Sequence, residues 1–390
     1  MSAIPVPFSC WPGVSRYLPA MVSKHPESER LLLGPGPSNV SSRVREAMAQ
    51  PLMGHLDPAF LTILDETQQR LAELFGVTGG LTVPLSAPGS AGMEACLINL
   101  LEPGDRIVTG VAGVFGGRMS EVATRAGAAV TRVETEWGTP LDTRAMIDAI
   151  ERVEPKVVSF VHAETSTGVL QPVEEIAAAA RAVGALVVLD CVTSLSGVGL
   201  ALDAWHVDAA YSGTQKCLSV PPGLSPVHFS PRALEAVQAR TTPVQSWFLD
   251  VSLLAGYYDG DRKYHHTAPV SAIFGLAEGL RIVAEEGMEK RELRHREAAA
   301  ALVSGLDELG FEPLVEAPFR LPMLTSVRLP EPLREGADAA VRSRLLDHHG
   351  IEVGAGLGAL AGQIWRIGLM GENARVSAVD RLLDALRTEC

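Results

Sequence analysis

One lysine and one aspartate in this chain follow apolar runs that have the length and composition of buried strands. Lys216 comes after the run at residues 209–211 and a stretch of small hydroxylated residues, and a Pro-Pro-Gly turn at residues 221–223 ends the segment. Asp190 closes a second apolar run, residues 185–189. A lysine amine forms a Schiff base with an aldehyde, and a carboxylate keeps a pyridine nitrogen protonated. The pair therefore meets two requirements of pyridoxal phosphate (PLP). Since most lysines that follow strands are simply solvated, other motifs must support this interpretation.

Three loops carry groups suited to a flat, phosphorylated cofactor. Gly89, Ser90 and Ala91 lie at a strand-to-helix turn, where backbone N–H groups bind phosphate, although the same residues also suit an ordinary tight turn. The loop lacks the Lys-Ser/Thr pair of nucleotide-triphosphate loops. Phe115 stands among glycines and can stack on a flat ring or fill the core. Thr165 follows a strand and can donate to a ring substituent or serve turn chemistry.

Two further segments offer anion-binding side chains. Tyr264 and Thr267 flank His265 and His266. Adjacent histidines in a strand point to opposite faces and seldom share a metal, so phosphate-binding hydroxyl groups are the favoured reading and no metal site is expected. Arg366 lies in an apolar strand-like segment, where it needs an anionic partner. That partner is either a substrate carboxylate bound by two hydrogen bonds or a structural acidic residue.

Composition narrows the class of protein. The 390-residue chain is 47% apolar and 20% charged, and its net charge is −13, which disfavours nucleic acid and anionic membranes as partners. Its five cysteines are scattered without a paired spacing, which predicts reduced thiols rather than a disulfide frame or a zinc site. No apolar run has transmembrane length and the start does not resemble a signal peptide, so a cytoplasmic location is expected.

The order of the elements predicts the fold class. From residue 81 to residue 190, near-continuous apolar strands alternate with helices, which indicates an α/β fold with a mostly parallel sheet covered on both faces. Ligands bind such sheets at the carboxyl ends of the strands. Beyond about residue 269 the pattern changes to a smaller α+β unit. We predict three parts: an arm at residues 1–29 that lies on a partner subunit, a large cofactor-binding domain at 30–287, and a small C-terminal domain at 288–390.

These motifs together resemble the class V aminotransferases of PLP fold type I, and most closely the alanine–glyoxylate / serine–pyruvate group. The matching segments run in family order from about residue 31 to residue 388: LLLGPGPSN, GSAGMEA, EPGD, HAETSTGVLQP, VVLDCVTSLSG, AYSGTQKCLSVPPG, YHHT, HREAAA and WRIGLMG. The resemblance implies a large domain with a sheet of the seven-stranded type and a smaller C-terminal α+β domain.

The resemblance also implies a role for each site residue. Lys216 would form the Schiff base with PLP and move the proton, and Asp190 would pair with the pyridine nitrogen. Phe115 would stack on the ring and Thr165 would bond its oxygen. Substrate binding would fall to Arg366 and Gly36, and phosphate binding to Gly89, Ser90, Ala91 and Gln215, joined by Tyr264 and Thr267 of the neighbouring subunit in a homodimer.

The expected activity follows from the family. It is transfer of an amino group from a small L-amino acid, alanine or serine, to glyoxylate or pyruvate. The main alternative is a same-fold transaminase for a rarer amine, such as ureidoglycine, pyridoxamine, an aminophosphonate or a biosynthetic intermediate. A dinucleotide-dependent oxidoreductase would rest on the glycine-rich residues 354–358, which lack a following strand–helix–strand unit. A non-catalytic binding protein would make Lys216 incidental.

Overall fold

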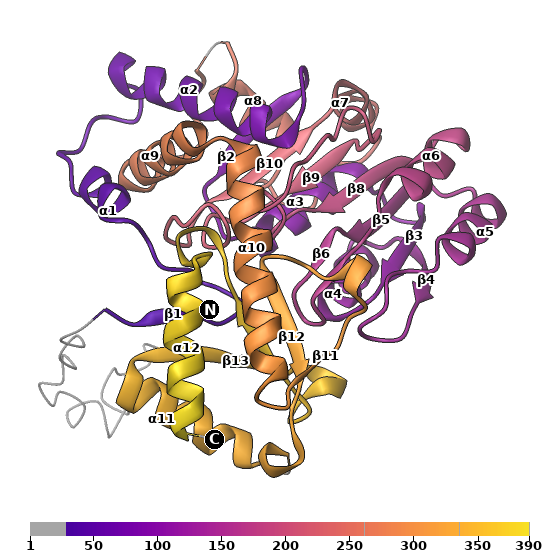
Figure 1. The fold of residues 1–390 in the computed structure, drawn as a ribbon. Coiled ribbons are helices and arrows are strands. Elements are labelled where there is room, and N and C mark those ends of the chain that lie inside the picture. Colours follow the sequence, from indigo (N-terminus) through magenta and orange to yellow (C-terminus); the bar gives the residue numbers. More distant parts are fainter. Residues whose placement is uncertain (1–28, 261, 335, 390) are drawn as a thin grey trace, which may run out of the picture.

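The computed structural model describes residues 29–260, 262–334 and 336–389, so most of the predicted arm at residues 1–29 lies outside the described residues. Two sheets organise the described chain (Figure 1). The larger sheet has seven strands in the spatial order β2 (Leu81–Leu85), β10 (Ser225–Phe229), β9 (Ala209–Tyr211), β8 (Leu186–Asp190), β5 (Val157–Val161), β3 (Arg106–Val111) and β4 (Ala129–Glu134).

The larger sheet is parallel except for one strand. β10 is antiparallel to both of its neighbours, β2 and β9, while the pairs from β9 across to β4 are all parallel. The predicted mostly parallel α/β fold is thus confirmed. Its central strands are buried along their whole length because helices cover both faces. The helices of this part are α1 (Ser42–Met48), α2 (Pro58–Phe75), α3 (Gly89–Leu100), α4 (Val114–Arg125), α5 (Thr143–Val153), α6 (Glu174–Ala182), α7 (Pro231–Gln238), α8 (Val251–Tyr258) and α9 (Val270–Glu286).

The smaller sheet has five strands and a core of its own. Its order is β1 (Leu31–Leu33), β13 (Ile351–Ala355), β14 (Ile364–Gly368), β12 (Leu324–Arg328) and β11 (Glu312–Pro313). The helices of this part are α10 (Met288–Asp307), α11 (Ala337–His349) and α12 (Val376–Glu389). Short elements complete the list: the hairpin β6 (Ala163–Glu164) and β7 (Val169–Leu170), and the 3-10 turns η2 (Ala317–Phe319), η3 (Glu331–Leu333), η4 (Gly358–Leu360) and η5 (Gly371–Asn373).

Strand β1 joins the two parts of the chain. Although it opens the stretch predicted as the large domain, residues 30–287, it pairs in parallel with β13 of the smaller sheet. The chain then leaves β1 at Gly34 and runs to the larger sheet, where the Ser38 amide donates to the carbonyl of Gln215 at 2.9 Å. The segment that follows β1 therefore lies between the two sheets.

The position of α3, the helix that follows β2, is set by the close packing of Gly92. The ideal Cβ position of Gly92 lies only 2.1 Å from Ser225 Oγ and 3.0 Å from Tyr211 Cβ, so α3 approaches β9 and β10 at a distance that only glycine permits. This contact sets the position of the α3 N-terminus over the carboxyl edge of the sheet.

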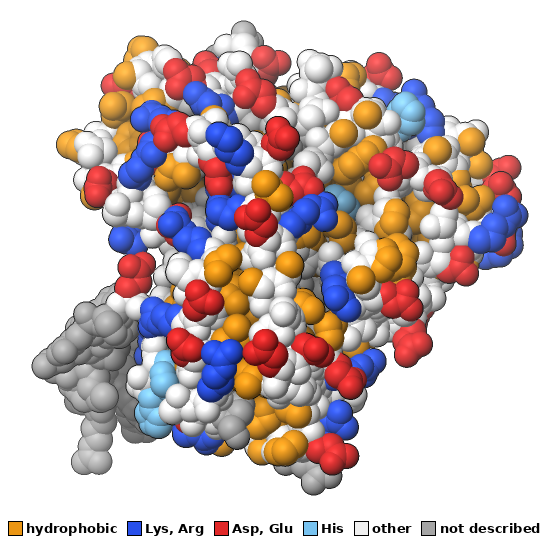
Figure 2. Space-filling view, in the orientation of Figure 1, with side chains coloured by type: hydrophobic (Ala, Val, Ile, Leu, Met, Phe, Trp, Pro, Cys, Tyr) orange, Lys and Arg blue, Asp and Glu red, His pale blue; other side chains and the backbone are white. Residues whose placement is uncertain are grey.

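Two general features bear on partners. On the face shown in Figure 2, acidic and basic side chains are interspersed rather than gathered into a patch of one sign. Within the described residues, no helix combines the length and the apolar character that crossing a bilayer requires.

Candidate active site

A cavity of about 180 Å³ opens at the carboxyl edge of the larger sheet. Lys216 and Asp190 both line it, as do five other residues that the sequence singled out. Those five are Gly89, Ser90, Phe115, Thr165 and Gln215. They meet because the loops after β2, β3, β5, β8 and β9 all leave the sheet at this edge.

The Lys216 side chain is half-buried and lies against the segment that follows β1. Its Nζ donates a hydrogen bond to the carbonyl oxygen of Pro35. Gly36 has a φ of +108°, and a Cβ at that position would lie 2.7 Å from Nζ, so a side chain larger than hydrogen would displace the lysine. Burial lowers the pKa of the amine to about 8, because the charged form loses solvation. Gly36 thus contacts the lysine directly, although it does not line the cavity.

The Asp190 carboxylate closes strand β8 and is 2% exposed. One oxygen, Oδ1, accepts from the Val192 amide at 2.8 Å, and the other, Oδ2, accepts from the Tyr211 hydroxyl at 2.7 Å. Burial raises the pKa of Asp190 to about 7, an effect that these two hydrogen bonds oppose. A buried carboxylate of this kind is stabilised in its ionised form by a cation, and a protonated pyridine nitrogen is one.

The start of α3 provides an anion-binding turn. Its N-cap is Pro88, which makes no side-chain hydrogen bond to the helix, and Gly89 and Ser90 follow at the cavity wall. Free N–H groups and the helix dipole favour a phosphate there. Gln215 approaches from the Lys216 loop, and its buried Oε1 has no hydrogen-bond partner among the described residues. Ala91 lies one residue deeper in α3 and is not part of the cavity lining.

Glu164 holds the backbone at Phe115 through hydrogen bonds to the start of α4. This carboxylate is 1% exposed; its Oε2 accepts from the amides of Phe115 and Gly116 at 3.1 and 3.3 Å, and its Oε1 accepts from the amide and hydroxyl of Ser166 at 3.0 and 2.6 Å. Ser166 Oγ in turn accepts from the Val114 amide at 2.9 Å. The two side chains cap α4, whose own N-cap is a glycine without a capping side chain. The backbone at Phe115, at the start of α4, is therefore held by Glu164.

Arg366 reaches the same region from the smaller sheet. Strand alternation places it on the face opposite Trp365 and Ile367, which belong to the smaller core. Its Nε donates to the carbonyl of Ala355 at 2.7 Å and its Nη1 to the carbonyl of Thr165 at 3.1 Å. Neither partner is an acidic side chain, so the structural salt bridge that the sequence left open does not form within the described residues. Arg366 does not itself line the cavity.

Tyr264 and Thr267 lie elsewhere on the chain. Both are exposed, Tyr264 by 64%, and neither lines this cavity. The two histidines between them occupy an irregular segment, so the premise that they point to opposite faces of a strand was wrong. Their Nδ1 atoms are 2.8 Å apart, and the His266 Nε2 lies 2.7 Å from the hydroxyl of Ser86 in the loop before α3.

Sequence reasoning missed several residues of the site. Arg118 lines the cavity one helical turn after Phe115, with its guanidinium carbon 5.1 Å from the centre of that ring. Its spacing to Phe115 was the available signal. Glu164 and Tyr211 were also missed, because the contacts that tie them to the site, Glu164 to Gly116 and Tyr211 to Asp190, span 48 and 21 residues. The remaining lining residues are Pro88, Met93, Ala163, Val192 and Thr193.

Comparison with known proteins places this geometry in a family. The model of the family described as Aminotransferase class-V matches residues 37–378, and the chain belongs to that family. It is an aminotransferase with the fold-type-I architecture of PLP enzymes.

Three relatives illustrate the similarity. A solved structure of an alanine–glyoxylate aminotransferase from Nostoc sp. superimposes with a TM-score of 0.91 at 44% identity, covering 94% of this chain and 97% of that one. The alanine–glyoxylate aminotransferase of Oryctolagus cuniculus is 39% identical, with 92% of each chain covered. The (S)-ureidoglycine–glyoxylate transaminase of Bacillus subtilis is 38% identical, covering 89% of this chain and 87% of that relative.

The role of Glu164 can be tested by substitution. Glu164→Ala leaves the buried donors of Phe115, Gly116 and Ser166 without their acceptor, and we expect it to lower the free energy of unfolding by about 2 kcal/mol or more. Glu164→Gln keeps one carbonyl acceptor and should lose clearly less. Urea unfolding of the three proteins measures the difference. Equal stability of wild type and Glu164→Ala would show that these bonds do not hold the α4 terminus.

Proposed function

We propose that this aminotransferase uses PLP to move an amino group from a small L-amino acid, alanine or serine, to glyoxylate or pyruvate. The observation that carries the proposal is the burial of the Lys216 amine and the Asp190 carboxylate in one cavity at the carboxyl edge of the larger sheet. Two of the relatives described above are named for alanine and glyoxylate.

A second candidate is the transfer of the amino group of ureidoglycine to glyoxylate. It is favoured by the similarity to the Bacillus subtilis transaminase that is named for this donor, at 38% identity. Since glyoxylate appears in the names of all three relatives, the two candidates share the acceptor and differ in the donor.

The residues present fit PLP. The turn at Gly89–Ala91 and Gln215 would hold the phosphate, Asp190 would pair with the pyridine nitrogen, Phe115 would stack on the ring, and Thr165 would bond its oxygen. When bound, PLP supplies an electron sink that stabilises the negative charge left when a proton leaves the substrate α-carbon.

Lys216 supplies the amine and the base. With a pKa of about 8, roughly a tenth of the side chains are neutral at pH 7, about three hundredfold more than for an ordinary lysine. A neutral amine is required both for nucleophilic attack and for accepting a proton from the α-carbon. The amine protonates as the pH falls below 8, so the fraction able to do either falls about tenfold for each pH unit.

Asp190 and Arg366 provide the fixed charges. Tyr211 and the Val192 amide hold the Asp190 carboxylate in one orientation, so that it stabilises a positive nitrogen without moving. Arg366 is held through Nε and Nη1, and no hydrogen bond is recorded for its Nη2 among the described residues. That nitrogen is the donor we assign to the substrate carboxylate.

The functional unit that we propose is a homodimer in which Tyr264 and Thr267 reach the phosphate in the neighbouring subunit. Their exposure and their position outside the cavity of their own chain support this arrangement. Neither a nucleic acid nor a membrane is part of the proposal.

The absorbance spectrum of the purified enzyme tests the reaction. We expect a visible band from PLP linked to Lys216, and its loss on addition of L-alanine as the cofactor takes up the amino group.

Lys216→Ala should remain folded by circular dichroism, lack that band and have no measurable turnover. Normal turnover in this variant would refute the proposed role of Lys216. If the wild-type band disappears with ureidoglycine and persists with alanine and serine, the second candidate replaces the first.

Arg366 is tested by its effect on KM. We expect Arg366→Met to raise the KM for the amino donor by about tenfold to a hundredfold, because a charge-assisted hydrogen bond to the carboxylate is lost. Cofactor binding, followed through the visible band, should change little. An unchanged KM would assign Arg366 to the structural contacts with Ala355 and Thr165 alone.

Mixing two inactive variants tests the sharing of residues between subunits. In a heterodimer of Lys216→Ala with Tyr264→Phe/Thr267→Ala, one site would contain Lys216 from one subunit and Tyr264 and Thr267 from the other. We expect activity to appear when the variants are unfolded together and refolded, and not when each is refolded alone. If Tyr264 and Thr267 act in their own chain, both sites of the heterodimer are defective and the mixture stays inactive.

A further inference from the structure

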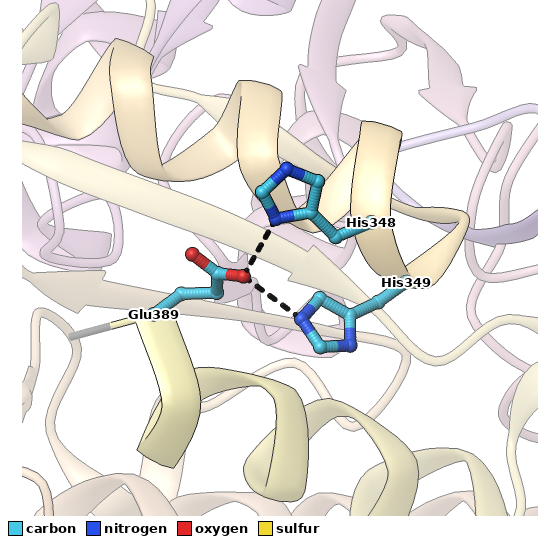
Figure 3. Close-up of side chains that lie close together, drawn as sticks. All are labelled: His348, His349 and Glu389. Atoms are coloured by element: carbon cyan, nitrogen blue, oxygen red, sulfur yellow. Dashed lines mark hydrogen bonds and ion pairs between the residues drawn. The ribbon is translucent and has the colours of Figure 1, made fainter.

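Two histidines and a glutamate converge at the end of the smaller domain, away from the cavity just described. His348 and His349 close helix α11, and Glu389 lies in the last turn of α12. Figure 3 shows both imidazole rings directed at the same carboxylate. The His348 Nδ1 and the His349 Nε2 are each 3.0 Å from Glu389 Oε1, and the three atoms all lie within 4.8 Å of one another.

The spacing of these donor atoms suits a small divalent cation. Zn²⁺ binds imidazole nitrogen and carboxylate oxygen at about 2.0–2.2 Å in a tetrahedron, which places neighbouring donors about 3.4 Å apart. The two nitrogen–oxygen distances of 3.0 Å therefore need to widen by only about 0.4 Å, within the reach of side-chain rotation. His348 is exposed, so an ion can approach from solvent and water can complete the coordination.

Arg344 prepares the carboxylate for this role. Its Nε donates to Glu389 Oε2 at 2.6 Å and its Nη2 to the Glu389 carbonyl at 2.9 Å, which leaves Oε1 directed at the histidines. Hydrogen bonds from His348, Arg344 and His349 lower the pKa of Glu389 to about 2, so the carboxylate is ionised at neutral pH. Orientation of a metal-binding carboxylate by a hydrogen bond to its second oxygen is common in metal sites. The positive charge of Arg344 also weakens cation binding, so micromolar rather than nanomolar affinity is expected.

We propose that His348 Nδ1, His349 Nε2 and Glu389 Oε1 bind one Zn²⁺ ion, with water at the open position. Without the metal, the two ring nitrogens donate protons to Oε1; with it, each presents a lone pair, so its proton moves to the other ring nitrogen or to solvent. The ion joins the ends of α11 and α12, and its role is to hold the C-terminal helix on the smaller sheet. The site is separate from amino-group transfer.

Calorimetric titration of zinc chloride into the full-length, PLP-loaded enzyme, after treatment with a chelator, tests the site. We expect one ion per chain with a dissociation constant on the order of micromolar. His348→Ala and His349→Ala should each weaken binding by tenfold or more. His206→Asn is the matched control, because it removes an exposed imidazole elsewhere from a position with φ of +59°, which Asn tolerates. Unchanged affinity in the double variant His348→Ala/His349→Ala would overturn the proposal, as would the absence of one-to-one binding in the wild type.

Thermal unfolding gives a second readout that does not depend on drastic substitutions. Glu389→Gln keeps the size of the side chain and one acceptor oxygen but loses the negative charge. Zinc chloride should raise the Tm of the wild type and of His206→Asn, and raise that of Glu389→Gln by much less. An equal rise in all three proteins would place the bound ion elsewhere and refute the site.

Discussion

The burial of one amine is the constraint on which the rest of this structure depends. Removing the Lys216 ammonium from water costs free energy, and the Pro35 carbonyl and the charge of Asp190 in the same cavity offset part of that cost. β8 and β9 carry Asp190 and Lys216 in parallel, and Tyr211 on β9 fixes the carboxylate at the end of β8.

The smaller sheet also approaches the candidate site, although the residues that line the cavity come from the loops of the larger sheet. It contributes Arg366 from β14 and, through β1, the segment that contains Pro35 and Gly36. The glycine-rich residues 354–358, which mimic a dinucleotide-binding motif, begin at the end of β13 and pack close to this same segment. A Cβ at Gly354 would lie 2.5 Å from Pro35 Cδ, so this glycine lets β13 pass close to the segment that touches the lysine. The glycines thus serve strand packing.

The parts of the site that the sequence predicted are those that depend on local order. Lys216, Asp190, Phe115 and Thr165 each follow a strand, and in a parallel sheet that fact alone brings them to one edge. Gly89 and Ser90 were predicted from a helix start, and Gln215 was predicted from the family resemblance. Strand bounds such as those of β9 followed from short apolar runs.

What the sequence did not predict depends on contacts between distant segments. Glu164 accepts from the amides of α4 only because the fold brings the start of α4 against β6, and Glu389 contacts His348 and His349 across about 40 residues. The placement of β1 in the smaller sheet is of the same kind, because a three-residue apolar run is compatible with either sheet and only pairing with β13 decides. The irregular path of the segment with His265 and His266 also lacked a periodic signal.

The contact between Gly36 and Lys216 has a mechanical consequence. The few residues that leave β1 are anchored in one sheet and press on an amine that belongs to the other. A rotation of one sheet against the other would draw the Pro35 carbonyl away from the nitrogen or push it closer, and the proton affinity of the amine would change with it. Any such change in the relative orientation of the two sheets would therefore act on the proton affinity of Lys216 through this one contact.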